Sequence, residues 1–246
     1  MNNASNIIGI TVCVNYSDLL KIALKQNTNF LKYIYVITKK EDLKTIESCK
    51  DYDNVEVLFD DFLIDMSWYD TWQFRYDSKQ AGQRPPPKRE SDVARINLKA
   101  FNKGKALRRG QKAAELKFPN DFYLIMDCDI VLNKYLIGKI NQTELEMDLL
   151  YGVRERRDYP TFQDFSQQKN YKTYGGSAGG WGFFQLYKNS TPIYYDNWHT
   201  AAATDKWFKE DVIKRDHANL KIFESHVDHL GQEGASQFLK DFKFDL

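Results

Sequence analysis

The chain lacks the features that mark several large classes of protein. No apolar run in its 246 residues approaches the roughly 20 residues that a membrane-spanning helix needs. The N-terminus has no basic region followed by an apolar core, so we expect neither a signal peptide nor a membrane span. Three cysteines are an odd number without framework spacing. They predict reduced thiols and a cytoplasmic location.

An excess of charge is missing as well. The formal net charge is +1, so the molecule as a whole does not favour a polyanionic partner. Basic residues do gather between Arg75 and Lys112, which raises the alternative of a nucleic-acid binder. Since no recognisable nucleic-acid-binding module accompanies that segment, we expect no nucleic-acid partner. The glycines between 175 and 182 are not followed by Gly-Lys-Ser/Thr, which excludes a P-loop.

The first 60 residues show a regular alternation of elements. Apolar, β-branched stretches predict strands at Ile7–Val14, Leu31–Thr38 and Val55–Phe59. Between them, the spacing of apolar residues predicts helices at Ser17–Asn27, with Ser17 as its cap, and at Glu41–Cys49. Strands and helices that alternate in this way are typical of a doubly wound α/β sheet with parallel neighbours.

A short apolar run that ends in two carboxylates stands near the middle of the chain. Phe122–Met126 reads as a strand that is buried on both faces, and Asp127-Cys128-Asp129 follows it directly. Two ionised carboxylates cannot both be buried without a partner. A divalent cation such as Mg²⁺ or Mn²⁺, with phosphate oxygens completing its shell, would neutralise them. Solvated acids at a turn are the alternative.

A long helix is predicted before this strand, from Ser91 to about Leu116. On such a helix Arg95, Lys99 and Lys103 recur every four residues and form a basic stripe. The segment before it, residues 60–90, holds two tryptophans and three consecutive prolines, and we interpret it as a lid near the site.

Shorter elements are expected in the second half of the chain. The pattern predicts helices at residues 133–140, 204–215 and the C-terminus, and strands at 147–153, 181–187 and 220–223.

Four features together resemble a known family, the GT-A fold glycosyltransferases that use nucleotide-sugar donors. They are the opening strand–helix–strand half, the helix segment Phe101–Leu107, Asp127-Cys128-Asp129, and His229-Leu230-Gly231. Arg108 stands where these enzymes commonly have Asn. The resemblance is to small glycan-building enzymes of the bacterial or large-DNA-virus type. It implies a Rossmann-like, doubly wound mixed sheet in a single domain, with residues 1–132 binding the nucleotide sugar and 133–246 the acceptor.

The resemblance also implies roles for individual residues. The residues expected to bind the nucleotide part of the donor are Val12, Val14, Asn15, Tyr16, Thr38, Arg95, Lys99, Lys103, Asp127 and Cys128. The residues expected to hold Mn²⁺ (or Mg²⁺) are Asp127, Asp129 and His229, with His226 as the rival histidine. The residues expected to contact the acceptor are Gly180, Trp181 and Trp198, together with Phe183. Asp205, in the first turn of a predicted helix, is the expected general base, and Glu155 and Asp158 are its alternatives.

The implied activity is metal-dependent transfer of a hexosyl or pentosyl group from a nucleoside-diphosphate sugar to a glycan hydroxyl. UDP ranks first as the carrier and GDP second. A carboxylate base favours inversion of configuration, and retention stays open. A sugar-phosphate nucleotidyltransferase would need a Gly-rich loop after the first strand, which Asn15-Tyr16-Ser17-Asp18 does not supply. A glycoside hydrolase would leave His229 unused. A non-catalytic relative that binds carbohydrate or nucleotide remains open.

Overall fold

A computed structural model describes most of the chain. The described residues are 6–61, 63–65, 99–101, 103–175, 183–188, 190–191, 193–194, 208–209 and 220–230, with 63–65 and 99–101 described by their backbone only. Within these ranges no helix has both the length and the apolar character needed to cross a membrane.

The N-terminal part forms four parallel neighbouring strands, as the sequence predicts. The strands are β1 (Ile7–Val12), β2 (Tyr33–Thr38), β3 (Val55–Phe59) and β6 (Phe122–Ile125). Their order is β3-β2-β1-β6, so the chain first adds strands on one side of β1 and then returns to pair β6 on the other. The order of strands therefore reverses at β1, which is where open α/β sheets bind ligands.

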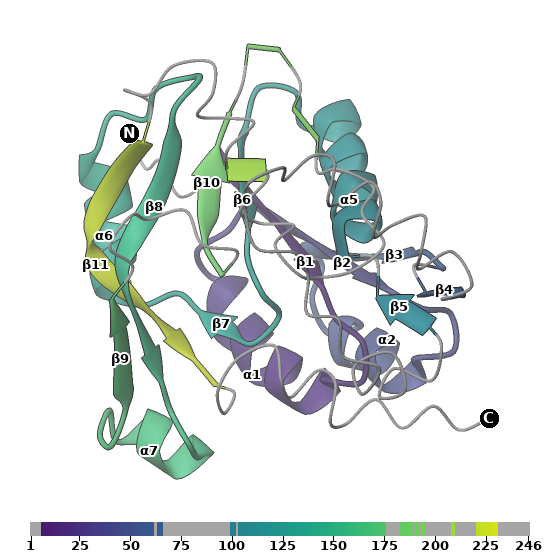
Figure 1. The fold of residues 1–246 in the computed structure, drawn as a ribbon, viewed down its shortest axis with the longest axis horizontal. Coiled ribbons are helices and arrows are strands. Elements are labelled where there is room, and N and C mark those ends of the chain that lie inside the picture. Colours follow the sequence, from purple (N-terminus) through teal and green to yellow (C-terminus); the bar gives the residue numbers. More distant parts are fainter. Residues whose placement is uncertain are drawn as a thin grey trace, which may run out of the picture.

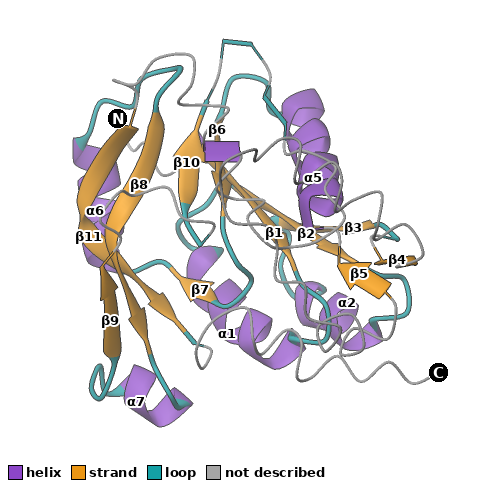
Figure 2. Cartoon of the chain, viewed as in Figure 1, coloured by secondary structure: helices purple, strands orange, loops and turns teal. Residues whose placement is uncertain are grey.

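Helices cover both faces of this sheet (Figures 1 and 2). The helices are α1 (Ser17–Asn27), α2 (Leu43–Cys49), α5 (Lys103–Lys117) and α6 (Lys134–Gln142). One core cluster joins residues of α1, α2 and α6 to one face, and a second joins α5 to the other. The doubly wound, mixed α/β architecture predicted from the sequence is confirmed. At the start of α1, however, the N-cap is Tyr16 without a side-chain hydrogen bond, so Ser17 does not cap the helix.

Helix α5 begins later than predicted. Residues Lys99–Phe101 form strand β5, which pairs antiparallel with β4 (Leu63–Asp65) in a separate two-stranded sheet. The helix predicted from Ser91 to about Leu116 is confirmed from Lys103 onward but is wrong at Lys99–Phe101, so Lys99 and Lys103 do not share a helical stripe. Within α5, Gly110 lies so close to the sheet that an added Cβ would stand 2.5 Å from Ile10 Cγ2. This close packing holds the first turn of α5 at the carboxyl ends of the strands.

The second part of the chain extends the same sheet, so that nine of the described strands form one sheet. The added strands are β7 (Ile130–Val131), β8 (Leu150–Asp158), β9 (Lys172–Gly175), β10 (Gln185–Tyr187) and β11 (Leu220–His229). Strand β10 pairs antiparallel with β6, whereas β8 and β11 are parallel to each other. Both β8 and β11 are longer than predicted, since β8 continues through Asp158 and β11 contains His226 and His229.

Two connections fix the geometry near the Asp-x-Asp. Strand β7 pairs with the last residues of β11 and contacts α1, and Figure 1 shows it below β10. Helix α7 (Phe162–Ser166) joins β8 to β9, which pairs antiparallel with the second half of β8. The β8–β9 hairpin thus projects from the end of the sheet at which His229 lies.

Candidate functional site

The candidate site lies where β6 ends and β7 begins. Asp127 and Asp129 stand in the four-residue connection between these strands, at the same carboxyl end as the loop that follows β1. Backbone hydrogen bonds tie this connection to β11, because Leu230 N donates to Asp129 O over 3.1 Å. The β7–β11 pairing then places His229 opposite Ile130, one residue beyond Asp129.

Asn27, the last residue of α1, fixes the start of β7. Its buried side-chain amide donates to Ile130 O over 2.8 Å and accepts from Leu132 N over 2.9 Å. These two bonds copy the pattern that a neighbouring strand would make. The position of Asp129 is therefore set by α1 on one side and β11 on the other.

Asp129 and His229 form a buried pair. Asp129 Oδ2 lies 3.1 Å from His229 Nε2, and the two side chains are 13% and 7% exposed. The other oxygen of this carboxylate, Oδ1, is buried and has no hydrogen-bond partner among the described residues. A buried carboxylate oxygen without a partner is costly, so Asp129 is suited to receive a further cation or donor.

A second carboxylate holds the other side of the imidazole. His229 Nδ1 lies 3.2 Å from Asp158 Oδ1, which is an ion-pair contact and not a well-directed hydrogen bond. Arg156 Nε and Nη2 donate to the two oxygens of Asp158 over 2.7 and 2.9 Å. A chain of direct contacts thus runs from Asp129 through His229 and Asp158 to Arg156.

The pKa values within this chain follow from the pairing. Burial opposes the charge on Asp129, but attraction to His229 outweighs it and lowers the pKa of the carboxyl. Burial likewise opposes the charge on His229, but Asp129 and Asp158 raise the pKa of the imidazole to about 10. In the absence of a ligand, an imidazolium therefore lies between the two carboxylates.

Asp127, the first acid of the Asp-x-Asp, has a different partner. Lys103 Nζ, from the first residue of α5, donates to Asp127 Oδ1 over 2.7 Å. The Lys103 side chain is 13% exposed and that of Asp127 is 33% exposed. The two acids of the motif thus have separate cationic partners, a lysine from α5 and a histidine from β11.

The residues predicted to hold a nucleoside differ in exposure. Val12, Val14, Tyr16 and Thr38 are buried, and Asn15 alone among these five predicted residues is exposed. Asp42 explains the burial of Thr38, since its Oδ2 accepts from Asn15 N over 2.8 Å and lies 3.4 Å from Thr38 Oγ1.

Asp42 also caps α2 by accepting from Thr45 N over 3.2 Å. This one carboxylate therefore ties the ends of β1 and β2 to the start of α2. At Asn15 the backbone φ is 61°, a left-handed conformation that asparagine tolerates better than most residues.

The predicted metal ligands are brought together in part. Asp129 and His229 are adjacent, whereas the Asp127 carboxylate contacts Lys103. In the portion of the chain that the structure describes, no group of three or more His, Cys, Asp or Glu side chains is arranged to hold a metal ion. Two donors do fit a cation: the buried Asp129 Oδ1 without a partner, and His229, whose second nitrogen faces a carboxylate as in many metal-bound histidines.

Several predicted site residues lie outside the described residues, and Cys128 does not. Those outside are Arg95, Gly180, Trp181, Trp198 and Asp205, and Lys99 is described by its backbone only. Cys128 is buried within the core. A side-chain hydrogen bond with Cys13, burial and the adjacent acids raise the pKa of its thiol.

Sequence reasoning missed four residues that shape the site: Asn27, Asp42, Arg156 and Asp158 in its role as partner of His229. Arg156 and Asp158 are two residues apart, so they share one face of any strand that contains them. This spacing is the signal in the sequence, but the strand predicted from the apolar pattern ends at Val153, before both residues. Nothing in the sequence connects Asn27 to β7, which lies more than 100 residues further along.

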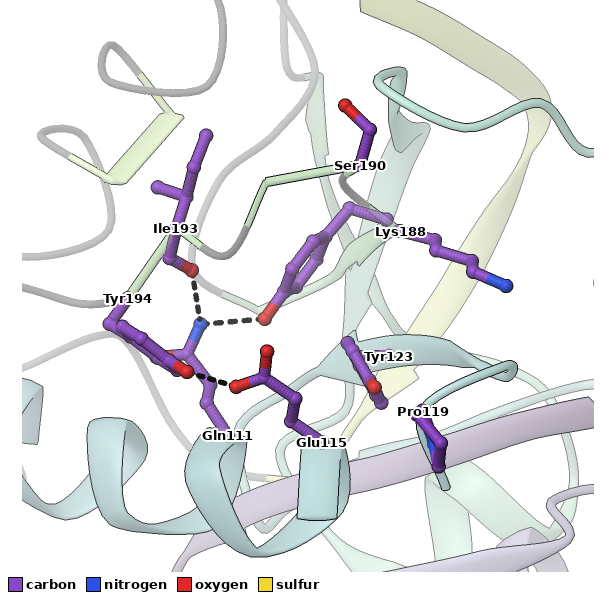
Figure 3. Close-up of a pocket in the computed structure, with 9 residues that line it drawn as sticks. Gln111, Glu115, Pro119, Tyr123, Lys188, Ser190, Ile193 and Tyr194 are labelled. Carbon is purple, nitrogen blue, oxygen red and sulfur yellow. Dashed lines mark hydrogen bonds between the residues drawn. The ribbon is translucent and has the colours of Figure 1, made fainter. Parts of the chain in front are cut away.

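A cavity of about 170 Å³ lies at the amino-terminal end of β6, whereas Asp127 and Asp129 follow its carboxyl end (Figure 3). Gln111 donates there to Tyr187 Oη over 2.6 Å and to Ile193 O over 3.2 Å. Tyr194 bonds Glu115 across the same cavity. Because ligands of open α/β sheets bind at the carboxyl ends of the strands, this position does not match that of a nucleotide site.

Comparisons with known proteins give weak likenesses of the fold. The chain resembles the crystal structure of 4-diphosphocytidyl-2C-methyl-D-erythritol synthase from Anaerococcus prevotii, with 11% identity, 97% of this chain and 95% of that chain covered, and a TM-score of 0.43. It also resembles a candidate glucose-1-phosphate thymidylyltransferase from Bacillus anthracis, solved with sucrose, with 12% identity, 98% of each chain covered and a TM-score of 0.40. Neither likeness is strong enough to carry an argument about activity. No family model and no curated protein sequence matches the chain.

Proposed function

We propose that this chain is a metal-dependent glycosyltransferase of the GT-A type, which moves a sugar from a nucleoside-diphosphate sugar to a glycan hydroxyl. The observation that carries the proposal is the Asp129–His229 pair. Asp129 follows β6 at the point where the strand order reverses, and His229 comes from β11, 100 residues further along the chain. A buried acid and histidine joined from such distant segments belong to two of the four features on which the resemblance rests.

Asp129 and His229 are the proposed ligands of Mn²⁺ or Mg²⁺. The Asp129 oxygen without a partner would provide one oxygen donor, and Nε2 of His229 would provide a nitrogen donor once the cation has displaced its proton. Such cations commonly take one or two protein ligands and complete their shell with substrate phosphates. The bound cation would neutralise the negative charge that develops on the leaving nucleoside diphosphate. Asp127 remains a proposed ligand or ribose contact.

Lys103 is the proposed fixed cation beside the diphosphate. It lies at the first turn of α5, where its ammonium group already holds Asp127. Because the N-terminus of a helix carries partial positive charge, the lysine and the start of α5 would act on phosphate together.

The nucleoside is proposed to lie against the loop after β1. Asn15 offers an exposed side chain there, and its neighbours Val14 and Tyr16 are buried, so they would offer backbone groups instead. Asp42 holds this loop to β2 and α2 and keeps its shape before a ligand binds. UDP ranks first as the carrier and GDP second. The residues from Cys13 to Tyr16 include no glycine, which disfavours nucleotidyl transfer.

The general base is proposed to be Asp205. Of the two alternatives, Asp158 accepts both hydrogen bonds from Arg156 and contacts His229, so it is poorly placed to take a proton from an acceptor. Glu155 stands one residue from Arg156 on β8, and its side chain therefore points to the opposite face from Asp158 and His229. A carboxylate that takes the proton from the acceptor hydroxyl favours inversion.

Ligand-dependent stabilisation tests the proposal. The melting temperature of the purified protein is measured with UDP, GDP, CMP and dTDP, each with and without Mn²⁺. A ligand that binds only the folded state raises the melting temperature. At a concentration of 100 times its Kd, it adds about 2.7 kcal/mol to the free energy of unfolding. We expect stabilisation by one nucleoside diphosphate that depends on Mn²⁺.

The products of the reaction separate sugar transfer from its closest rival. With the matching nucleotide sugar and Mn²⁺, a glycosyltransferase releases the nucleoside diphosphate, and slow donor hydrolysis reveals it even without an acceptor. A nucleotidyltransferase instead forms pyrophosphate from a nucleoside triphosphate and a sugar phosphate. Pyrophosphate release, or no stabilisation by any nucleotide under any metal, would contradict the proposal.

A further inference from the structure

The chain of contacts that begins at Asp129 ends on an aromatic surface. Arg156 is held by two hydrogen bonds to Asp158 and is 16% exposed. Its guanidinium carbon lies 5.2 Å from the ring centroid of Tyr174 and 5.4 Å from that of Phe183. The arginine is therefore a fixed, planar group between two rings, which is an arrangement that lysine cannot reproduce.

Tyr174 is open to solvent on this surface. It stands opposite Arg156 in the β8–β9 pairing, so both side chains point to the same face of the sheet. The tyrosine is 40% exposed, which is high for a large aromatic residue on a strand. An exposed ring that is anchored by a buried ion pair keeps its orientation at little further entropic cost.

The same face carries the Asp129–His229 pair. His229 on β11 stands opposite Asp158 on β8, and Arg156 is two residues before Asp158 on the same strand. Tyr174 lies on β9, which pairs with the other edge of β8. Strand spacing puts the Cα atoms of Tyr174 and His229 about 12 Å apart. A ligand on Tyr174 would therefore lie beside the proposed donor site, on the side away from β1 and its nucleoside loop.

The chemistry of this surface fits a sugar ring. A pyranose has a face of C–H groups, whose hydrogens are attracted to the negative face of an aromatic ring. Its hydroxyls accept hydrogen bonds, and the guanidinium of Arg156, which Asp158 holds in place, is a donor beside the Tyr174 ring. We propose that Tyr174 and Arg156 bind a pyranose ring of the acceptor glycan. This inference rests on the proposed function and names the part of the site that takes the acceptor.

The opposite face of the hairpin provides a matched control. Tyr171 is 36% exposed, and the guanidinium carbon of Arg157 lies 4.6 Å from its ring centroid. This second arginine–tyrosine pair has similar chemistry but points away from His229. Tyr171→Ala and Tyr174→Ala thus remove similar surface areas from opposite faces.

Saturation-transfer NMR with methyl pyranosides tests the inference. The probes are the methyl glycosides of glucose, galactose, mannose, xylose and rhamnose, each added at millimolar concentration to wild type, Tyr174→Ala, Tyr174→Phe and Tyr171→Ala. We expect at least one probe to bind wild type and Tyr171→Ala equally. Its Kd should rise about tenfold in Tyr174→Ala, the loss of one aromatic contact, and stay near the wild-type value in Tyr174→Phe.

Nucleotide stabilisation in the same four proteins separates this inference from the proposed function. Stabilisation by a nucleoside diphosphate with Mn²⁺ in Tyr174→Ala would show that the variant is folded and that its donor site is intact. With that result, equal sugar binding by Tyr174→Ala and Tyr171→Ala would overturn the acceptor site alone. Binding of no methyl pyranoside by wild type would overturn it too. Failure of every nucleotide to stabilise wild type would instead contradict the function.

Discussion

The two faces of the β8–β11 strand pair and its β9 hairpin carry nearly the same residue types but differ in what those residues do. One face, here called the site face, presents Arg156, Asp158, Tyr174 and His229. The other, here called the far face, presents Arg157, Tyr171, His226 and Asp228. Since side chains alternate along a strand, a shift of one residue (Arg156 to Arg157) or of three (Tyr174 to Tyr171, His229 to His226) moves a side chain to the other face.

On the site face the histidine is paired with carboxylates that stabilise its positive charge, whereas on the far face burial favours the neutral forms of the histidine and the acid. His229 lies within 3.2 Å of two carboxylates, and its pKa is raised to about 10. On the far face, His226 stands 3.7 Å from Asp228, and burial lowers the pKa of its imidazole. Burial also raises the pKa of Asp228 to about 6, because Tyr159 and Arg157 offset only part of its effect.

The difference arises from a third segment of the chain. Asp129, in the β6–β7 connection, adds a second carboxylate to the site face, whereas on the far face Tyr159 donates a 3.3 Å hydrogen bond to Asp228. A histidine, an arginine and an acid on two strands are thus not sufficient for a charged centre. The fold must also place a second carboxylate, here Asp129, beside the imidazole nitrogen that the strand pair itself leaves without an acid, which is Nε2 of His229.

The largest contrast is expected between Asp129→Asn and Asp228→Asn. Both changes replace a buried carboxylate by its neutral isostere, but only the first removes a proposed cation ligand. We expect Asp129→Asn to abolish Mn²⁺-dependent stabilisation by the nucleotide and to slow sugar transfer by at least about 100-fold, as the loss of one electrostatic contact to a transition state does. Asp228→Asn should retain both. Equal losses in the two variants would remove the distinction between the faces.

A smaller contrast is expected in stability between His229→Gln and His226→Gln. Without its imidazolium, His229→Gln leaves Asp129 and Asp158 facing each other in a buried site. Breaking a buried ion pair in this way costs about 3–5 kcal/mol, or a fall in melting temperature of about 10 °C. His226→Gln removes only the 3.7 Å contact and should cost less than about 1 kcal/mol. Urea denaturation followed by circular dichroism gives both values, and a larger loss in His226→Gln would contradict the assignment of the faces.

The sequence was most informative where local pattern and tertiary structure agree. The strands β1, β2 and β6 are largely buried apolar runs whose neighbours pack on both faces, so composition alone marks them, and the half-buried β3 shows the same apolar composition except at Glu56. Lys99–Phe101 behaves differently, because its conformation is decided by pairing with Leu63–Asp65, more than 30 residues earlier. The local periodicity of residues 99–101 does not reveal such a pairing, and their apolar spacing therefore predicts a continuation of the helix.

The site residues also divide into those that local sequence pattern reveals and those that only tertiary contacts reveal. Asp127 and Asp129 could be found because two acids after a buried strand are unusual, and the structure adds that His229 contacts the second of them. The choice of Thr38 as a nucleoside contact followed its place at a strand end, but the sequence does not reveal that Asp42 folds back over its hydroxyl. The strand predicted at 147–153 continues through the charged residues Arg154 to Asp158, because pairing with β11 and β9 extends it beyond the apolar pattern.

The smallest contrast is expected between Arg156→Lys and Arg157→Lys. Lysine keeps the charge but cannot donate both hydrogen bonds to Asp158, so His229 loses the support that orients it. Residues that orient a metal ligand are worth about 10–100-fold in metal affinity, and we expect Arg156→Lys to raise the Mn²⁺ concentration for half-maximal nucleotide stabilisation about tenfold. Arg157→Lys, whose buried Nε has no hydrogen-bond partner among the described residues, should leave it unchanged. Melting temperatures without ligand check that both variants fold, and an unchanged Mn²⁺ requirement in Arg156→Lys would show that Asp158 holds His229 without the arginine.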